Sequence, residues 1–186
     1  MKKLIALALL LGASVPLRAA EYAAEKDLNA PLFDAAKEGD VAGVARALKG
    51  GLNVNARDSK GYSALIYAAY HGQVDAVAYL LKSGGDPCLK DNRGNTATLG
   101  AIFKGHFGIA KTLMRSKCGV NAVNNAGQTP LMYAALFGRK EIAKALLSKG
   151  ADPTMKDAGG NSAVSLAEGQ GNEEMVRVLE RADGSR

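Results

Sequence analysis

The stretch QTPLMYAALFG at residues 128–138 carries the pattern that decides the fold. A polar residue that can cap a helix precedes Pro130, whose missing N–H costs nothing in a first helical turn. Apolar residues follow, and Gly138 suits a helix C-terminus in the left-handed conformation. A second helix is expected from about Glu141 to Ser148, where apolar residues recur at helical spacing before Gly150. The pattern therefore predicts two short helices followed by an extended, turn-rich connection.

The same pattern recurs along the chain at a fixed interval of 33 residues. Two series of glycines mark the interval, namely Gly61, Gly94, Gly127 and Gly160, and Gly39, Gly72, Gly105, Gly138 and Gly171. A fixed period of this size is the signature of a repeat architecture. The glycines divide the chain into units at residues 29–61, 62–94, 95–127, 128–160 and a shortened 161–186.

Stacking of the units is required because each predicted helix is only about two turns long, and isolated helices below ~12 residues are marginal in water. Neighbouring units can bury the apolar faces that one unit cannot bury alone. Alanine pairs such as Ala68-Ala69 and Ala134-Ala135 recur where helices would touch, and small side chains allow close approach. Only 5% of residues are aromatic and none is Trp, which suits thin, closely stacked helices.

These units resemble ankyrin repeats. Pro130-Leu131, Ala134-Ala135 and Gly138 match the family's Thr-Pro-Leu-His-x-Ala-Ala-x-x-Gly opening, residues 149–152 match its Gly-Ala-Asp segment, and residues 54–56 and 120–122 match its Val-Asn-Ala. The resemblance covers residues 29 to about 182. It implies an all-α ankyrin-repeat solenoid of stacked helix-turn-helix units with extended hairpin-like connections.

The sequence departs from the family pattern in two ways. The family's His in the opening tetrapeptide is absent from every unit, so the hydrogen bond that it makes in the family is expected to be missing. Unit 95–127 is the least regular, with Thr98 where Leu is expected, Gly100 inside the first helix and Lys117 where the left-handed Gly is expected. A glycine inside a helix costs roughly 1 kcal/mol relative to Ala. This unit is therefore expected to be the weakest of the middle three and to act as a hinge.

Residues 1–20 have the layout of a signal peptide. A Lys-Lys start precedes the apolar run Leu4–Leu11, which is too short to cross a bilayer as a helix, and small residues follow at Ala19 and Ala20. Cleavage is expected after one of these alanines and leaves residues 21–28 as a lead-in. The alternative is a cytosolic N-terminal helix. We therefore expect a periplasmic or secreted protein that has no membrane attachment after cleavage.

The charge distribution argues against nucleic acid as a partner. The formal net charge of +6 falls to +3 once Lys2, Lys3 and Arg18 leave with the signal peptide. Basic and acidic residues are interleaved, as at residues 139–141, whereas a nucleic-acid binder shows a basic stripe.

Catalytic and metal-binding patterns are also absent from the sequence. Of the two histidines, His106 follows Gly105, where the family often has a structural His, and His71 is expected on the inner face. There is no nucleophile elbow or phosphate-binding loop, and metal sites need clustered ligands. We therefore expect a protein without enzymatic activity, cofactor or metal. An enzyme or small-ligand binder with its site in the groove is the alternative.

A partner protein is expected to bind in the concave groove that the resemblance implies, between the connection tips and the exposed ends of the first helices. The residues expected to bind it are Tyr62, Tyr70, His71, Arg93, Phe103, Lys104, Leu136 and Phe137. Exposed apolar patches usually mark interaction sites, and aromatic anchors tend to carry binding energy. The alternative is that these rings fold down between neighbouring first helices as additional core. The expected function is that of an exported, monomeric adaptor, inhibitor or protective partner, and the resemblance extends to proteins of oxidative-stress defence or toxin immunity.

Cys88 and Cys118 raise the question of a disulfide. An oxidising compartment favours pairing of an even number of cysteines. Both residues follow the second helices of neighbouring units, where equivalent residues are ~8–10 Å apart. A disulfide needs Cα atoms within about 7 Å. We therefore expect two unpaired residues, with Cys118 in the place of Ala151 and Cys88 in that of Thr154; a reshaped turn that accommodates a bridge is the alternative.

Overall fold

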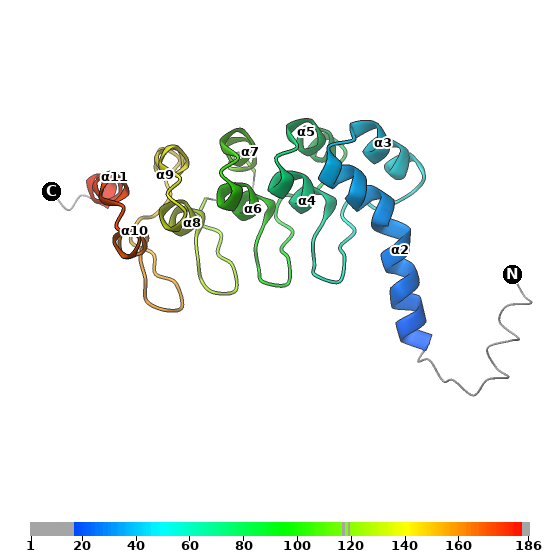
Figure 1. Ribbon diagram of the computed structural model, residues 1–186, viewed down its shortest axis with the longest axis horizontal. Coiled ribbons are helices and arrows are strands. Elements are labelled where there is room, and N and C mark those ends of the chain that lie inside the picture. Colours follow the sequence, from blue (N-terminus) through cyan, green and yellow to red (C-terminus); the bar gives the residue numbers. More distant parts are fainter. Residues whose placement is uncertain (1–16, 117, 119, 184–186) are drawn as a thin grey trace, which may run out of the picture.

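The computed structural model describes residues 17–116, 118 and 120–183. Within these ranges the chain forms ten helices and no strand, apart from one isolated bridge between Arg57 and Ser63. The helices form five pairs in a row, and loops extend from one side of the row (Figure 1). The pairs are α2 (Leu17–Glu38) with α3 (Val41–Lys49), α4 (Ala64–His71) with α5 (Val74–Lys82), α6 (Ala97–Lys104) with α7 (Phe107–Leu113), α8 (Pro130–Leu136) with α9 (Lys140–Leu147), and α10 (Ala163–Gly169) with α11 (Glu173–Asp183).

The first helix of the row begins inside the expected signal peptide. Residues 1–16 of that segment lie outside the described residues. Residues 17–20 and the expected lead-in at 21–28 are helical, because α2 begins at Leu17 and continues into the first unit. In the part of the chain that the structure describes, no helix is both long and apolar enough to cross a membrane.

Local sequence signals set the ends of the helices. Thr129 Oγ1 accepts a hydrogen bond from Met132 N at 3.2 Å, and Pro130 is the first residue of α8, as its sequence predicts. Gly138 follows α8 with φ +66°, a left-handed conformation that few other residues adopt. The second helix of this unit, α9, begins and ends one residue earlier than expected.

In two units, the residue that replaces the family's His makes a hydrogen bond of its own. Met132 Sδ accepts from Thr129 N at 3.3 Å, and Ser165 Oγ accepts from Ser162 N at 2.9 Å. The expectation of a missing hydrogen bond is therefore wrong for these two units. In each of them the side chain at the position of the family's His accepts from the backbone N–H of the residue that caps the helix.

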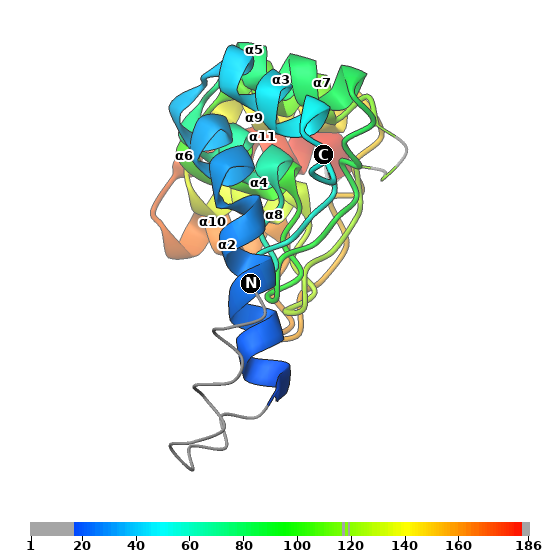
Figure 2. The same ribbon diagram turned by 90° about the vertical axis from the view of Figure 1, so that its right-hand side faces the viewer.

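The core lies between the helices of neighbouring units. Ala68 and Ala69 in α4 and Ala134 and Ala135 in α8 are fully buried, and they pack in one cluster with larger residues such as Leu80. Viewed along the row, the second helices form one layer and the first helices another, with the loops extending beyond the first helices (Figure 2). The expected stack of helix-turn-helix units is confirmed.

Side chains that follow the first helices hold each unit against the one before it. Each reaches the carbonyl group of a residue near the end of the preceding first helix. The pairs are Gln73 Nε2 with Lys37 O at 2.7 Å, His106 Nε2 with Tyr70 O at 3.2 Å, and Arg139 Nη2 with Phe103 O at 2.9 Å. His106 thus has the structural role expected for it.

Asparagines bridge the turns that follow the second helices. Asn55 Oδ1 accepts from Asp86 N at 2.8 Å, while Asn55 Nδ2 donates to Gly84 O at 3.2 Å. Asn121 makes the same two contacts one junction further on, with Asp152 N at 2.9 Å and a long contact to the Gly150 carbonyl at 3.5 Å. Each asparagine therefore reaches residues 29 and 31 positions later in the chain.

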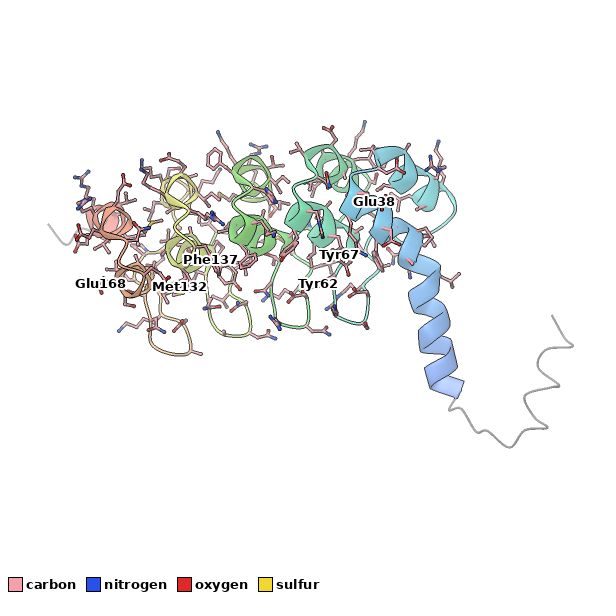
Figure 3. The ribbon with its side chains drawn as sticks, in the orientation of Figure 1. Glu38, Tyr62, Tyr67, Met132, Phe137 and Glu168 are labelled. Atoms are coloured by element: carbon pink, nitrogen blue, oxygen red, sulfur yellow. A yellow bond between two sulfur atoms is a disulfide. The ribbon has the colours of Figure 1, made fainter. Side chains whose placement is uncertain are left out.

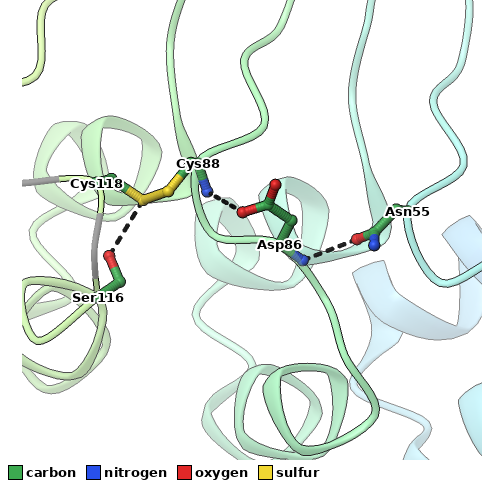
Figure 4. The surroundings of a disulfide bond; sticks show 5 residues. All are labelled: Asn55, Asp86, Cys88, Ser116 and Cys118. Atoms are coloured by element: carbon green, nitrogen blue, oxygen red, sulfur yellow. Dashed lines mark hydrogen bonds between the residues drawn. A yellow bond between two sulfur atoms is a disulfide. The ribbon is translucent and has the colours of Figure 1, made fainter.

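The junction between units 62–94 and 95–127 has a disulfide in place of an asparagine bridge of this kind. Cys88 occupies the register position of the two asparagines, and it is joined to Cys118 with Cα atoms 5.2 Å apart (Figure 4). The expectation of unpaired cysteines is wrong. It rested on the spacing of equivalent residues, whereas a side chain at this position points between the residues 29 and 31 positions later, and Cys118 is 30 positions later. At this junction the sequence also has Lys117 and Gly119 where the others have the glycine and aspartate that bond to asparagine.

Candidate functional site

We call the groove the surface formed by the first helices α4, α6 and α8 with the loops that precede them. An aromatic row runs along it. The rings of Tyr70 and Phe103 stack with centroids 5.9 Å apart, and Phe103 meets Phe137 edge-on at 4.8 Å. Tyr70 and Phe103 are each 37% exposed, so both rings reach the surface while most of each residue is covered. Phe137 is half-buried and also contacts Tyr133 at 5.5 Å. Figure 3 shows Phe137 beside α8 and Tyr62 and Tyr67 beside α4.

Positive charge accompanies the aromatic row. Lys104 Nζ lies 4.9 Å from the centroid of the Tyr70 ring, and the His71 ring lies 5.4 Å from it. Cation–π contacts of this kind are favourable and keep the ammonium group at the surface. Arg93 is exposed in the loop that precedes α6.

A pocket of about 360 Å³ opens at the junction of units 62–94 and 95–127. It brings together five of the expected partner-binding residues, Tyr62, Tyr70, His71, Arg93 and Phe103. Lys104, Leu136 and Phe137 do not line it. Leu136 is partly buried in α8. The other residues of the lining were not among the expected partner-binding residues, and they are Ile66, Tyr67, Asp91, Asn95, Leu99, Gly100 and Tyr133.

The pocket lies where a glycine stands at a position that carries tyrosine in the two neighbouring units. Tyr67 in α4 and Tyr133 in α8 occupy the same position of their units, and the corresponding residue of α6 is Gly100. Space that a side chain fills in the neighbouring units is therefore open here. The signal was present in the 33-residue register, but Gly100 was interpreted only as a residue that weakens a helix.

The flanking tyrosines are hydrogen-bonded phenols. Tyr67 Oη donates to Asp58 Oδ2 at 2.6 Å, and Tyr133 Oη donates to Asn95 Oδ1 at 3.1 Å. Burial, and then the hydrogen bond to Asp58, raise the pKa of the Tyr67 hydroxyl, and burial also raises the pKa of Tyr133. Both side chains therefore remain protonated donors at neutral pH.

Asp91 supplies the polar end of the pocket. Its Oδ1 accepts from Arg93 N and Asn95 N, both at 2.8 Å, and its Oδ2 accepts from Asn95 Nδ2 at 3.1 Å. Asp58 closes the preceding loop in the same way, with Lys60 N and Tyr62 N on Oδ1. The two loops differ at Oδ2, which receives a tyrosine hydroxyl in Asp58 and an asparagine amide in Asp91.

In the described part of the chain, no three His, Cys, Asp or Glu side chains gather closely enough to hold an ion. The arrangement as a whole is suited to holding an apolar or aromatic group against an aromatic wall, with one carboxylate at its polar end.

Comparison with known families agrees with this structure. The family described as ankyrin repeats (3 copies) matches residues 5–91, 84–157 and 100–184, which together span most of the chain. The chain belongs to the ankyrin repeat family, and its fold is the all-α ankyrin-repeat solenoid. Ankyrin repeats are general protein–protein interaction modules. A search of curated proteins found no match.

Proposed function

We propose that this protein is an exported, non-catalytic, monomeric module that binds one partner protein through the groove. The observation that carries the proposal is the aromatic row of Tyr70, Phe103 and Phe137, which leaves two large rings more than one third exposed beside a pocket. Aromatic anchors next to a pocket are typical of residues that dominate binding energy. The role is that of an adaptor, inhibitor or protective partner, with oxidative-stress defence and toxin immunity as the settings that the family resemblance suggests.

Export is supported by two independent features. Residues 1–20 have the composition of a signal peptide, and Cys88 and Cys118 form a disulfide. Disulfides persist in oxidising compartments and are rare in the cytosol. Both features support the proposal that the protein acts in the periplasm or outside the cell.

The pocket supports a second candidate function, the binding of a small molecule. Its volume of about 360 Å³ lies within the range of ligand sites, and Asp91 offers a polar group for orientation. This candidate predicts that a free ligand binds in the absence of any protein partner.

A double variant tests the proposed function. Partners captured in the native compartment are measured against the wild type and against Tyr70→Ala with Phe137→Ala. We expect binding to weaken by more than about 2 kcal/mol while the fold persists, as for hot-spot residues. Phe107→Ala is the matched control, because Phe107 is 40% exposed but lies on α7, on the layer of second helices.

Equal binding by a folded double variant would contradict the proposal. Loss of the fold in that variant would instead show that the two rings act as core.

A further inference from the structure

The glycine at position 100, where the two neighbouring units carry Tyr67 and Tyr133, indicates what the pocket can hold. In the second unit, the Tyr67 ring packs between Tyr62 and Phe33, with ring centroids 5.3 Å and 5.8 Å away, and its hydroxyl ends on Asp58. In the third unit the backbone of α6 and the carboxylate of Asp91 are both present, but Gly100 provides no ring between them. The pocket therefore has the backbone and the carboxylate that surround the Tyr67 ring in the second unit, but no side chain at position 100 fills it.

The room at Gly100 is real space at the side-chain level. The three atoms nearest to a Cβ placed on Gly100 belong to Tyr70, the closest at 3.8 Å, which is an ordinary van der Waals distance. The pocket volume of about 360 Å³ exceeds the ~150 Å³ of an engineered apolar cavity that binds benzene. A phenol ring therefore fits between Tyr67 and Tyr133.

Hydrogen bonding selects among aromatic rings. Asp91 is only 7% exposed, and a ring in the pocket would remove what water it retains. A buried acceptor that loses its water without gaining a donor is costly. An ionised carboxylate has about four lone-pair sites, so Oδ2 can accept a hydroxyl in addition to the bond from Asn95, as Asp58 Oδ2 does from Tyr67. The polar end thus favours a phenol over a plain phenyl ring, and the carboxylate disfavours an anionic group at that end.

Charges around the mouth select what flanks the ring. The exposed side chain of Arg93 lines the pocket, and Lys104 lies over the face of Tyr70 at its edge. Carboxylates beside the incoming ring would meet these cations.

We propose that the pocket receives a tyrosine side chain of the partner protein, flanked by acidic residues, whose hydroxyl donates to Asp91. This inference rests on the proposed function, because it assumes that a protein segment lies in the groove. The partner's tyrosine then fills, at Gly100, the place that Tyr67 and Tyr133 fill in the two neighbouring units.

Capped tripeptides test the inference on the disulfide-bonded, isotope-labelled protein by NMR titration. The probes are Glu-Tyr-Glu, Glu-Phe-Glu and Lys-Tyr-Lys, each acetylated and amidated. We expect saturable shifts of amides in residues 95–103 with Glu-Tyr-Glu, and affinities at least threefold lower for the other two peptides.

Three variants test where the tyrosine ring binds. Gly100→Tyr supplies the missing side chain from α6 and should abolish binding of Glu-Tyr-Glu. Gly108→Tyr is its matched control, because Gly108 is an exposed glycine inside α7 with no atom near a built Cβ, and it should keep wild-type affinity. Asp91→Asn should retain the loop, since Asn124 closes the next loop in the same way, and should lower the preference for Tyr over Phe without abolishing it, because Asn124 Nδ2 also donates to Tyr133 Oη at 3.4 Å.

Three results would overturn the inference: Glu-Phe-Glu binding as tightly as Glu-Tyr-Glu, no saturable shift with Glu-Tyr-Glu, or its full binding to folded Gly100→Tyr. Titration with p-cresol separates the sources of a phenol, because tighter binding of p-cresol than of the peptide would assign the pocket to a free small molecule. The proposed function fails separately. If the Tyr70 and Phe137 double variant loses its captured partner while the peptides do not bind, the groove binds protein without a tyrosine anchor.

Discussion

Asn55 shows how a single side chain sets the contact between two units. Its amide group accepts from one backbone group and donates to another, and both belong to the turn of the next unit. Asn55→Ala removes both bonds, each worth about 0.5–1.5 kcal/mol. We expect the free energy of unfolding to fall by roughly 1–3 kcal/mol in denaturant titrations.

Thr154→Ala is the control at the same register position. Thr154 Oγ1 bonds to Asp152 Oδ1 in its own loop, at 2.7 Å. We expect this variant to lose less than about 1 kcal/mol, because no bond between units is removed. Equal losses in the two variants would show that the asparagine bridge does not contribute as proposed.

The sequence predicted the repeat, but it did not predict the disulfide or the pocket. The glycine series, the capping Thr129 and the structural role of His106 all follow from the sequence, because each depends on local backbone chemistry. The disulfide and the pocket depend on side chains 30 or more residues apart. Both become readable once Cys88 is aligned with Asn55 and Gly100 with Tyr67, since a change at one register position then points to the residue that compensates for it.

At the scale of the element, one glycine lies inside α6 and a second glycine follows its last residue. Gly100 lies within the helix and has open space, whereas Gly105 follows it with φ +81°. Gly100→Ala should raise the free energy of unfolding by about 0.5–1 kcal/mol, because alanine loses less backbone entropy on folding. Thermal and denaturant unfolding of the oxidised protein measure the change.

Gly105→Ala should act in the opposite direction. A Cβ there would lie 3.0 Å from the guanidinium carbon of Arg139, and the left-handed conformation is itself unfavourable for alanine. We expect a loss of about 1–2 kcal/mol. A stability gain in Gly105→Ala, or a loss in Gly100→Ala, would contradict this account of the helix.

At the scale of the whole molecule, the stack behaves as a sum of units and of junctions between neighbours. The weakest unit expected from sequence, 95–127, is also the one that the disulfide ties to the preceding unit. The same two units form most of the pocket, so the covalent bond joins the units between which the proposed binding site lies. The sequence predicted a hinge in this unit, and whether the oxidised protein bends there stays a prediction.

Reduction of the disulfide should divide the stack into two cooperative parts. The bond closes a loop of 30 residues, which in the chain-entropy account stabilises the folded protein by about 3–4 kcal/mol. Without it, the junction between units 62–94 and 95–127 has neither the covalent bond nor an asparagine at the register position of Asn55 and Asn121, and it keeps bonds such as those of His106 and Asn125. We expect the reduced protein, or Cys88→Ser with Cys118→Ser, to unfold at lower denaturant concentration and in two steps. Amide exchange should be fastest in residues 95–116.

The sequence of the other junctions supplies the control for this prediction. Cys88→Asn with Lys117→Gly, Cys118→Ala and Gly119→Asp rebuilds the combination found at Asn121 and Gly150–Asp152. This variant should recover a single unfolding transition that reductant does not change, because two hydrogen bonds then do in part what the disulfide does. A single unfolding transition and unchanged amide exchange in the reduced wild type would contradict this prediction. They would show that the junction is stable without a disulfide or an asparagine bridge.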